Sequence, residues 1–419
     1  MVNHFCLSVN NKLRNGCYTA ITLAKLLMIA YLFLFLDLTQ IIIKIGTFGI
    51  HLLLSVIPLL KFIFIMKKAA LIFLSTCSLG ATLHAQKSIS KINQLQVIGS
   101  HNSYRQALES DLYNLVGKRD TTNSYQGLQY EHIAITDQLN KGLRNLEIDV
   151  YADTIGGKYA HPKGLELIHS KIAYDPEGVM NKPGFKVLHM PDIDFRTSCL
   201  TLELCLQELK KWSTDNPNHT PVFITLEPKD GGPNFFNNQP EEFTTALFDQ
   251  LDQVIINTLG SDKVITPDDV RGSYKTLEEA VLHHNWPSLK NAQGKFLFIM
   301  DNNGAKKTMY AEHHPSLKRA VLFINAEPGT PEAATLFRND PKDATIKDLV
   351  EKGYLIRTRA DADTKEARTN DYSRFEEAKK SGAQIITTDY YMPSQLFDST
   401  YEVKFEDGTY VRKNPVNGK

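Results

Sequence analysis

The chain has 419 residues, with 47 acidic and 47 basic side chains, so its formal net charge is zero. This length is sufficient to bury a large core, as one large α/β domain or as two smaller domains. The balanced charge argues against a basic nucleic-acid-binding surface and against a polybasic membrane-binding segment.

The amino-terminal part of the chain differs in composition from the rest. Residues 1–65 contain two strongly apolar stretches, "ITLAKLLMIAYLFLFLDL" and "HLLLSVIPLLKFIFI", and at Met66 a new pattern begins, "MKKAALIFLSTCSLGATLHAQKS". Two lysines precede an apolar run, and the residues LHA precede Gln86. This arrangement is typical of a secretory signal peptide that is cleaved near Ala85.

We therefore expect residues 66–85 to be a signal peptide, residues 1–65 to be an upstream extension, and residues 86–419 to be a single domain. The predicted location is secreted or periplasmic. A membrane anchor within residues 21–65 is the alternative, since the apolar run there is long enough to span a bilayer.

Eight short apolar runs rich in β-branched residues follow, at residues 95–101, 145–152, 185–190, 221–229, 295–302, 321–328, 354–362 and 384–391. Near-continuous apolar runs are typical of strands that are covered on both faces, as in a parallel sheet. Helical patterns lie between several of the runs; "PEEFTTALFDQLDQVIINTLG", for example, starts with a proline and acids and ends at Gly260. The alternation predicts an α/β protein with a (β/α)8 TIM barrel, with a doubly wound sheet as the alternative.

Cys199 and Cys205 are the only cysteines after Gln86. In an exported protein, such a pair favours a disulfide. Residues six apart on a regular helix are too distant to bond, so a bridge requires Cys199 to precede the helix that contains Cys205. The alternative is two buried free thiols on one helix face.

Polar side chains are concentrated where the first four predicted strands end. They are His101 and Asn102, Glu147 and Asp149, His189, and Glu227 with Lys229. In a (β/α)8 barrel the carboxyl ends of all strands lie on one face, where active sites are found. Each group alone would have an ordinary structural explanation, such as a salt bridge or a turn, but together they indicate a functional site.

The oxygen-bearing side chains in this set favour a hard cation. Glu147 and Asp149 are two residues apart, so both point to one side of a strand, where their like charges need a cation. Glu227 and the amide oxygen of Asn102 add two oxygen donors. Such a set suits Ca²⁺ and, less well, Mg²⁺ or Mn²⁺, whereas Zn²⁺ favours more nitrogen or sulfur. The histidines then remain for proton transfer.

The segments "GSHNSY", "LEIDVY", "VLHM" and "PVFITLEPK" resemble the successive motifs of calcium-dependent phosphoinositide-type phospholipases C, in particular the secreted bacterial phosphatidylinositol phosphodiesterases. The resemblance extends over about residues 92–392 and includes "RTRADAD" and "GAQIITTDYY". It implies a (β/α)8 barrel that uses Ca²⁺ to cleave an inositol phospholipid at phosphorus, on a membrane surface. Diacylglycerol and a cyclic inositol phosphate, which further hydrolysis would open, are the implied products.

The resemblance also implies a role for each motif residue. His101 and His189 would be catalytic, and the Ca²⁺ ligands would be Asn102, Glu147, Asp149 and Glu227. Glu147 or Asp149 would accept the proton of the inositol 2-hydroxyl, which attacks phosphorus. His101 would stabilise charge on the phosphoryl oxygens, and His189 would protonate the departing diacylglycerol oxygen.

The predicted head group is unphosphorylated phosphatidylinositol or a similar inositol-phosphate lipid. The fifth run ends in "MDNNG", so Asp301 stands where eukaryotic relatives have lysines for ring phosphates, and its charge disfavours a polyphosphorylated ring. Candidate substrate-binding residues at the ends of later runs are Lys229, Arg357, Arg359, Asp361 and Tyr390. Their alternative interpretation is ordinary salt bridges at the top of the barrel.

Two other functions are compatible with a barrel that carries these groups. A glycerophosphodiester phosphodiesterase shares the acidic pair and the histidines, but "HNSY" departs from the arginine and glycine that normally follow its first histidine. A non-catalytic lipid- or glycan-binding barrel would have no need of both histidines and all four oxygen donors. No sequence feature indicates a protein partner.

Overall fold

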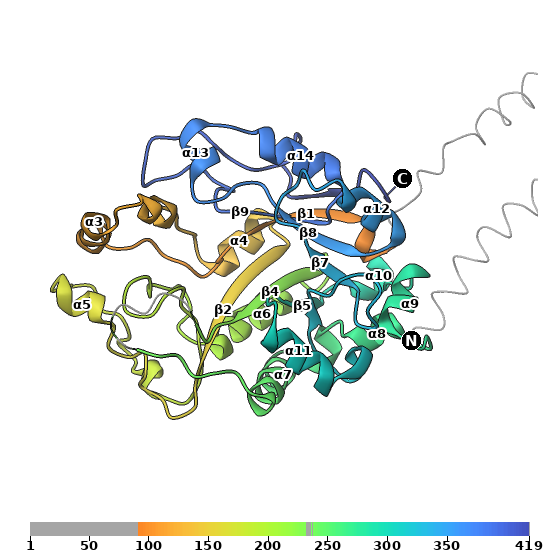
Figure 1. The fold of residues 1–419 in the computed structure, drawn as a ribbon, viewed down its shortest axis with the longest axis horizontal. Helices are drawn as coiled ribbons and strands as arrows, with labels where there is room; N and C mark the ends of the chain where they lie inside the picture. The colour runs from red at the N-terminus through yellow and green to blue at the C-terminus, as the bar shows by residue number, and fades with distance from the viewer. Residues whose placement is uncertain (1–90, 232–235, 237, 419) are drawn as a thin grey trace, which may run out of the picture. The chain divides into compact units, whose positions relative to one another are not determined.

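The computed structural model describes residues 91–231, 236 and 238–418, and the chain from Lys87 onwards forms one compact unit. Eight parallel strands form a nearly closed barrel in the order β6-β5-β4-β2-β1-β9-β8-β7 (Figure 1). They are β1 (Leu95–Ser100), β2 (Asn145–Asp153), β4 (Val222–Pro228), β5 (Phe296–Met300), β6 (Phe323–Ile324), β7 (Thr335–Phe337), β8 (Leu355–Arg359) and β9 (Ile385–Thr388). A parallel bridge between Asn325, which follows β6, and Thr335, which begins β7, links the two ends of this strand order. The predicted (β/α)8 fold is confirmed.

One predicted barrel strand is wrong. In the run 185–190 only β3 (Gly184–Lys186) is a strand, and it pairs antiparallel with the end of β2 through Tyr151 and Lys186 instead of joining the barrel. The run is apolar because Phe185, Val187 and Leu188 are buried. His189 therefore lies in a loop after a short hairpin strand and not at the end of a barrel strand.

The eighth barrel position belongs to β7, which the sequence pattern did not reveal. Its three residues are all buried, and it pairs in parallel with β8 from Thr335 to Phe337. A strand this short has too few residues to show a periodic pattern.

Helices surround the barrel, and short ones occupy its loops (Figure 1). Those in the first half are α3 (Ser110–Arg119), α4 (Ile135–Lys141), α5 (Lys163–Leu167), α6 (Leu202–Asp215) and α7 (Thr245–Leu259). Those in the second half are α8 (Pro267–Arg271), α9 (Leu277–Leu282), α10 (Leu289–Ala292), α11 (Ala305–His313), α12 (Thr345–Lys352), α13 (Lys365–Thr369) and α14 (Ser373–Ser381). None of the helices in the described part of the chain combines the length and apolar character that a membrane span requires.

The helix α7 shows how local sequence and packing agree. Thr244 caps its first turn, because its side chain accepts a hydrogen bond from the backbone N–H of Leu247. Leu247, Leu251 and Ile255 repeat at helical spacing and are buried in the core. The helix ends before Gly260, as the sequence predicts.

The predicted disulfide is present. Cys199 bonds to Cys205 with 5.4 Å between their Cα atoms. Cys199 precedes α6, whose N-terminal cap is Thr201, and Cys205 lies in its first turn. The bridge is thus possible because Cys199 is outside the helix, as the spacing requires.

Gly99 brings the first two strands together just before the polar cluster. A Cβ atom on Gly99 would lie 2.4 Å from both the Cβ and the carbonyl oxygen of Asn145 on β2, so only glycine fits. This contact is the single register pair between β1 and β2. It places the turn after β1 beside the middle of β2, where the acidic pair lies.

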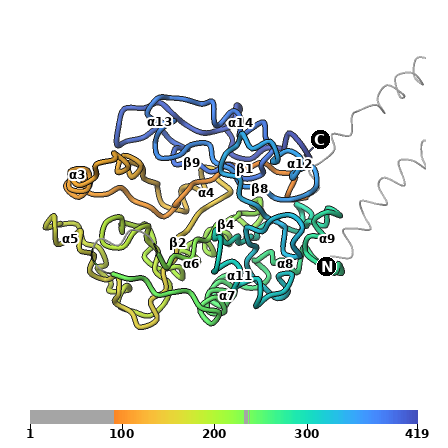
Figure 2. Tube along the Cα trace, in the orientation of Figure 1, coloured from red at the N-terminus to blue at the C-terminus, as the bar shows by residue number. Residues whose placement is uncertain are grey.

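Two long excursions from the barrel follow β1 and β2. Figure 2 traces the chain from β1 out to α3 and from β2 out to α5 at the same end of the molecule. Side chains of α3 and α5 share one apolar cluster, in which Leu112 and Phe195 are buried and Leu165 packs against them. These two excursions carry the loops that border the polar cluster.

Candidate active site

The turn after β1 is held between two strands. The backbone N–H of His101 donates to the carbonyl of Thr388 on β9 at 3.1 Å, and that of Ser103 donates to the carbonyl of Glu147 on β2 at 2.8 Å. Asn102 between them has a φ of 49°, a left-handed conformation that asparagine tolerates better than most residues. The turn therefore fixes His101 and Asn102 over the carboxyl ends of the strands.

His101 is positioned by two acidic side chains. Its Nδ1 lies 2.8 Å from Oδ1 of Asp389, and its Nε2 lies 3.5 Å from Oε1 of Glu147. Burial alone would raise the pKa of Asp389, but the adjacent His101 and Arg359 hold that pKa below its ordinary value. An ionised carboxylate can only accept a hydrogen bond. Nδ1 of His101 therefore carries a proton and donates the hydrogen bond that Asp389 accepts.

Three of the predicted ligands converge. Carboxylate oxygens of Glu147, Asp149 and Glu227 all lie within 4.8 Å of one another. The cause is the register of β2 and β4, which pairs Asp149 with Glu227 directly. Two cations contact the group: Arg357 donates to Oε2 of Glu147 at 2.7 Å, and Nζ of Lys229 lies 2.9 Å from Oδ2 of Asp149.

The cations near this cluster do not balance its negative charge. Burial and the neighbouring Asp149 raise the pKa of Glu227 to about 8. Burial also raises the pKa of Asp301 to about 6, although Arg357 acts in the opposite direction. A cation bound beside such carboxyl groups would favour their ionised form and lower their pKa.

The donor set fits Ca²⁺. Within the described residues, Oδ1 of Asn102 and Oδ1 of Asp149 are buried and have no hydrogen-bond partner. A buried acceptor without a partner is costly, and a bound cation would satisfy it. Three carboxylates and an amide oxygen, without sulfur, are the ligands that Ca²⁺ prefers. That these four residues are the ligands stays a prediction.

His189 is held in the loop after β3 by a buried ion pair. Its Nδ1 lies 2.7 Å from Oδ2 of Asp194, and Nε of Arg105 lies 2.7 Å from the same oxygen. Burial would raise the pKa of Asp194, but Arg105 and His189 hold it below its ordinary value. Nδ1 of His189 therefore carries a proton and donates it to the hydrogen bond with Asp194, and Nε2 is the other ring nitrogen of this partly exposed side chain.

Further contacts connect this loop to the turn after β1. The guanidinium of Arg105 lies 4.1 Å from the centre of the Tyr130 ring, and the hydroxyl of Tyr130 accepts a hydrogen bond from Nδ2 of Asn102 at 2.7 Å. Asp194, Arg105 and Tyr130 thus relate the position of His189 to that of Asn102. These contacts link the loop that carries His189 to the turn after β1, although β3 is outside the barrel.

The predicted substrate-binding residues divide into two groups. Lys229 and Arg359 lie at the cluster with partly exposed side chains. Arg357, Asp361 and Tyr390 are buried, and each already has partners. Asp361 accepts from the backbone N–H of Asp389, and Tyr390 donates to the carbonyl of Gln129. That these three buried residues contact the substrate stays a prediction, and their burial argues against it. In the structure they support neighbouring groups.

Sequence reasoning missed the two aspartates that orient the histidines. Asp389 follows β9 directly, within the run 384–391, and an acid at a strand end was the signal that could have found it. Asp194 lies in a loop, five residues after His189. Nothing in its local sequence distinguishes it from Asp192, which bonds to the backbone of Lys163 instead.

Comparisons with known proteins agree with the resemblance. Residues 90–415 match the family described as phosphoinositide phospholipase C, Ca²⁺-dependent. No curated protein matches the chain. A calcium-dependent phosphoinositol-specific phospholipase C from Pseudomonas sp. is 16% identical, over 78% of this chain and 96% of that one, with a TM-score of 0.47.

Two further solved structures are similar. The Ca²⁺-dependent phosphatidylinositol-specific phospholipase C of Streptomyces antibioticus is 18% identical, over 75% of this chain and 99% of that one, with a TM-score of 0.48. The phosphatidylinositol-specific phospholipase C of Listeria monocytogenes is 13% identical, over 72% and 90% of the two chains, with a TM-score of 0.39. Because the family match spans most of the chain, the protein belongs to the calcium-dependent phosphoinositide phospholipase C family of phosphodiesterases.

Proposed function

We propose that this chain is a phospholipase C that cleaves inositol phospholipids at a membrane surface, with Ca²⁺, to diacylglycerol and a cyclic inositol phosphate. One observation carries the proposal. The turn after β1 places Nε2 of His101 3.5 Å from Oε1 of Glu147, and Glu147 is one of the three carboxylates of the cluster. Two oriented histidines beside an oxygen-rich cation site match the chemistry of a phosphodiester that is attacked by its own hydroxyl.

The proposed Ca²⁺ ligands are Asn102, Glu147, Asp149 and Glu227. A bound Ca²⁺ would lower the cost of negative charge on the phosphoryl group and on the inositol 2-oxygen. Oδ1 of Asp149 and Oδ1 of Asn102 support this assignment, because they are buried acceptors without partners among the described residues.

The protein groups account for each proton in the reaction. The inositol 2-hydroxyl loses its proton to Glu147 or Asp149, and its oxygen forms a bond to phosphorus. His101 donates a hydrogen bond to a phosphoryl oxygen as charge develops there. The bond from phosphorus to the glycerol oxygen breaks, and His189 gives that oxygen a proton. Asp194 supports the role of His189, since its carboxylate stabilises the protonated ring.

We propose an unphosphorylated inositol ring as the head group. Asp301 follows β5 at the edge of the cluster, and its contact with Arg357 is long, at 4.0 Å. A ring phosphate near this carboxylate would meet repulsion. Lys229 and Arg359, the two partly exposed cations, are the proposed contacts of the bridging phosphate and the ring hydroxyls.

We also propose that the protein is exported after removal of residues 66–85, so that it acts on a membrane from outside the cytoplasm. The main support is the sequence pattern, because residues 1–90 lie outside the described part of the chain. The disulfide between Cys199 and Cys205 is compatible with an oxidising compartment.

The proposal can be tested with ³¹P spectra of the products. The purified protein is incubated with phosphatidylinositol, phosphatidylcholine and glycerophosphocholine, with Ca²⁺ or with a chelator. We expect a cyclic inositol phosphate signal from phosphatidylinositol alone, and only with Ca²⁺. Glycerol phosphate from glycerophosphocholine would instead identify a glycerophosphodiester phosphodiesterase, and the absence of any product would identify a non-catalytic barrel.

A further inference from the structure

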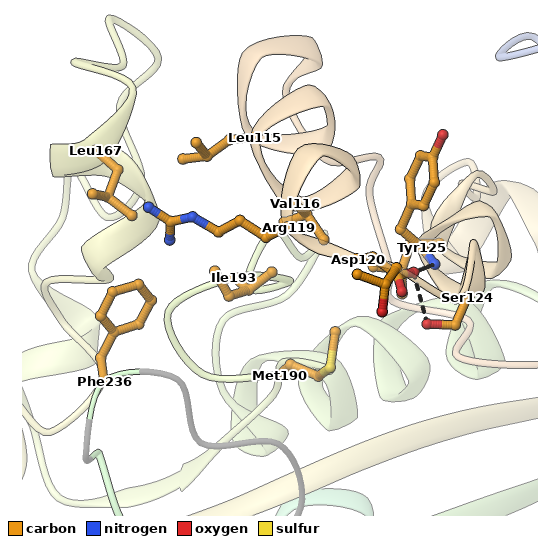
Figure 3. Close-up of a pocket in the computed structure, with 12 residues that line it drawn as sticks. Leu115, Val116, Arg119, Asp120, Ser124, Tyr125, Leu167, Met190, Ile193 and Phe236 are labelled. Carbon is orange, nitrogen blue, oxygen red and sulfur yellow. Dashed lines mark hydrogen bonds between the residues drawn. The ribbon is translucent and has the colours of Figure 1, made fainter.

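An apolar pocket of about 460 Å³ is lined in part by Met190, the residue that follows His189 in the sequence (Figure 3). This volume is within the range of about 300–1,000 Å³ that is typical of small-molecule sites. Its apolar lining comes from α3, from the turn that follows it, from α5, from the loop after β3 and from Phe236; it includes Leu115, Val116, Leu128, Leu167, Met190 and Ile193.

The loop of residues 189–194 connects the pocket to the proposed active site. Met190 and Asp194 bond to each other through both backbone N–H groups, at 2.9 and 3.1 Å, which closes a tight turn. His189 and Asp194 pair with each other through their side chains, while Met190 and Ile193 line the pocket. In Figure 3 these two apolar side chains lie below those of α3. The side chains of this short turn therefore fall into two groups: the His189–Asp194 pair and the two apolar side chains that line the pocket.

The charged side chains at the pocket differ in their availability. The carboxylate of Asp120 already has partners within its own turn, because it accepts hydrogen bonds from Thr122, Ser124 and the backbone N–H of Tyr125. Arg119 is exposed, and no ion pair of its side chain is found among the described residues. Its side chain extends across the pocket toward Leu167 (Figure 3). An apolar cavity with a free hydrogen-bond donor at its wall suits an alkyl chain that ends in an ester carbonyl.

We propose that this pocket binds one acyl chain of the diacylglycerol leaving group, with Arg119 donating to its ester carbonyl. The inference rests on the proposed function, because it assigns His189 to the glycerol oxygen. The acyl ester is attached within a few bonds of that oxygen, and the residue after His189 lines the pocket. The occupant is thus the part of the substrate that is closest to this loop.

The test uses monomeric phosphatidylinositols with acyl chains of four to eight carbons, below the concentration at which they form micelles. In the wild-type protein we expect kcat/KM to rise with chain length, toward the limit of about fourfold for each methylene that becomes fully buried. Val116→Trp fills the pocket from α3 and should remove most of this dependence. The slope is measured within each variant, so a general change in activity does not affect it.

A second variant and a matched control keep the result independent of folding. Leu167→Gln changes the opposite wall at a side chain that is already 41% exposed, and it should reduce the slope about twofold or more per methylene. Leu282→Gln makes the same change on α9, at a residue that is 45% exposed and does not line the pocket. It should keep the wild-type slope. An equal slope in all four proteins would overturn the proposal.

Calorimetric binding of dihexanoylglycerol, in the presence of chelator, separates this proposal from the proposed function. Binding by the wild type that Val116→Trp abolishes supports the pocket even if phosphatidylinositol is not cleaved. Cleavage of phosphatidylinositol without such binding overturns the pocket and leaves the proposed function intact. Dimerisation that Leu167→Gln abolishes would assign the apolar surface to a second copy of the chain, and would also overturn the proposal.

Discussion

His101 and His189 are each held through Nδ1 by a buried aspartate, yet they face different groups. Asp389 fixes His101 next to the carboxylate cluster, whereas Asp194 fixes His189 in the loop after β3. The same orienting device thus serves two separate positions, one in the turn after β1 and one in the loop after β3. In this account, His101 stabilises charge and His189 donates a proton, and the two roles respond differently to the leaving group.

We expect His189→Ala to lower turnover on phosphatidylinositol roughly 10²–10⁴-fold, because it removes a general acid. An inositol phosphate aryl ester, whose leaving group needs no proton, should restore much of this loss. His101→Ala should be restored much less by the same substrate. The measurement is kcat for both variants on both substrates; equal restoration, or none in either variant, would show that the division of roles is wrong.

Asp252 on α7 illustrates a buried carboxyl outside the active site. Its side chain accepts from the hydroxyl of Tyr310, and burial raises its pKa to about 7. The folded state therefore binds a proton more tightly than the unfolded state, whose aspartate has a pKa of about 4. Because of this difference, the free energy of unfolding should fall as pH rises from about 4 to about 7.

Asp252→Asn keeps an acceptor for Tyr310 and removes the titration. We expect the stability of the variant, relative to wild type, to improve by about 1.4 kcal/mol for each pH unit within this window, and to stay constant above it. Urea unfolding at several pH values measures the difference. A difference that does not change with pH would mean that Asp252 has an ordinary pKa in the folded protein.

At the scale of single residues, the sequence predicted the carboxylates of the cluster but not the residues that hold the histidines in position. Glu147, Asp149 and Glu227 were predictable because each is placed by a long strand, and strand register converts spacing into proximity. Asp194 and Arg105 were not, since a buried ion pair between a loop and a turn leaves no periodic signal. The pairing of Asp194 with Arg105 could be identified only from the positions of the loop and the turn in the structure.

At the scale of elements, length decided what could be predicted. Seven of the eight expected runs contain barrel strands, because most have several consecutive buried residues. The run 185–190 looked equally apolar but forms a hairpin with β2, and the three-residue β7 went undetected. Apolar character reports burial, and burial alone does not say which sheet partner a segment has.

The cysteine pair offers a test at this scale. The bridge closes a short loop that leads into α6, so replacing both cysteines with serine should lower the free energy of unfolding by about 2 kcal/mol. A reductant should destabilise the wild type by a similar amount and leave the double variant unchanged. Peptide mapping that finds both Cys199 and Cys205 alkylated without reduction would contradict the bridge.

At the scale of the whole molecule, the described chain is a barrel whose end segment returns to its beginning. β10 (Val411–Lys413) pairs antiparallel with β1, from Leu95 to Val97. This pairing covers one side of the strand that leads into the active-site turn. The family match ends at residue 415, so the returning segment is part of the matched region.

The signal-peptide hypothesis predicts the start of the mature protein. We expect amino-terminal sequencing of protein recovered from the medium or the periplasm to begin near Gln86, because cleavage should follow Ala85. Recovery of the protein in a membrane fraction, with residues before Met66 still attached, would favour the alternative of an anchor within residues 21–65.

We propose that four oxygen ligands hold a Ca²⁺ ion that the reaction requires. The most direct measurement is the rate of phosphatidylinositol cleavage as a function of free Ca²⁺, for the wild type, Asp149→Asn, Glu227→Gln and His189→Ala. Each amide substitution removes one negative charge from the ligand set, so half-saturation should need about tenfold more Ca²⁺ or higher, with activity partly restored at high concentrations.

His189→Ala is the matched comparison in this titration, because it leaves the ligand set intact. Its half-saturation should equal that of the wild type, while its maximal rate stays low at every Ca²⁺ concentration. Wild-type activity that persists in chelator, or amide variants with unchanged half-saturation, would contradict the claim. A collapse of Ca²⁺ affinity in His189→Ala would show that this histidine is itself a ligand.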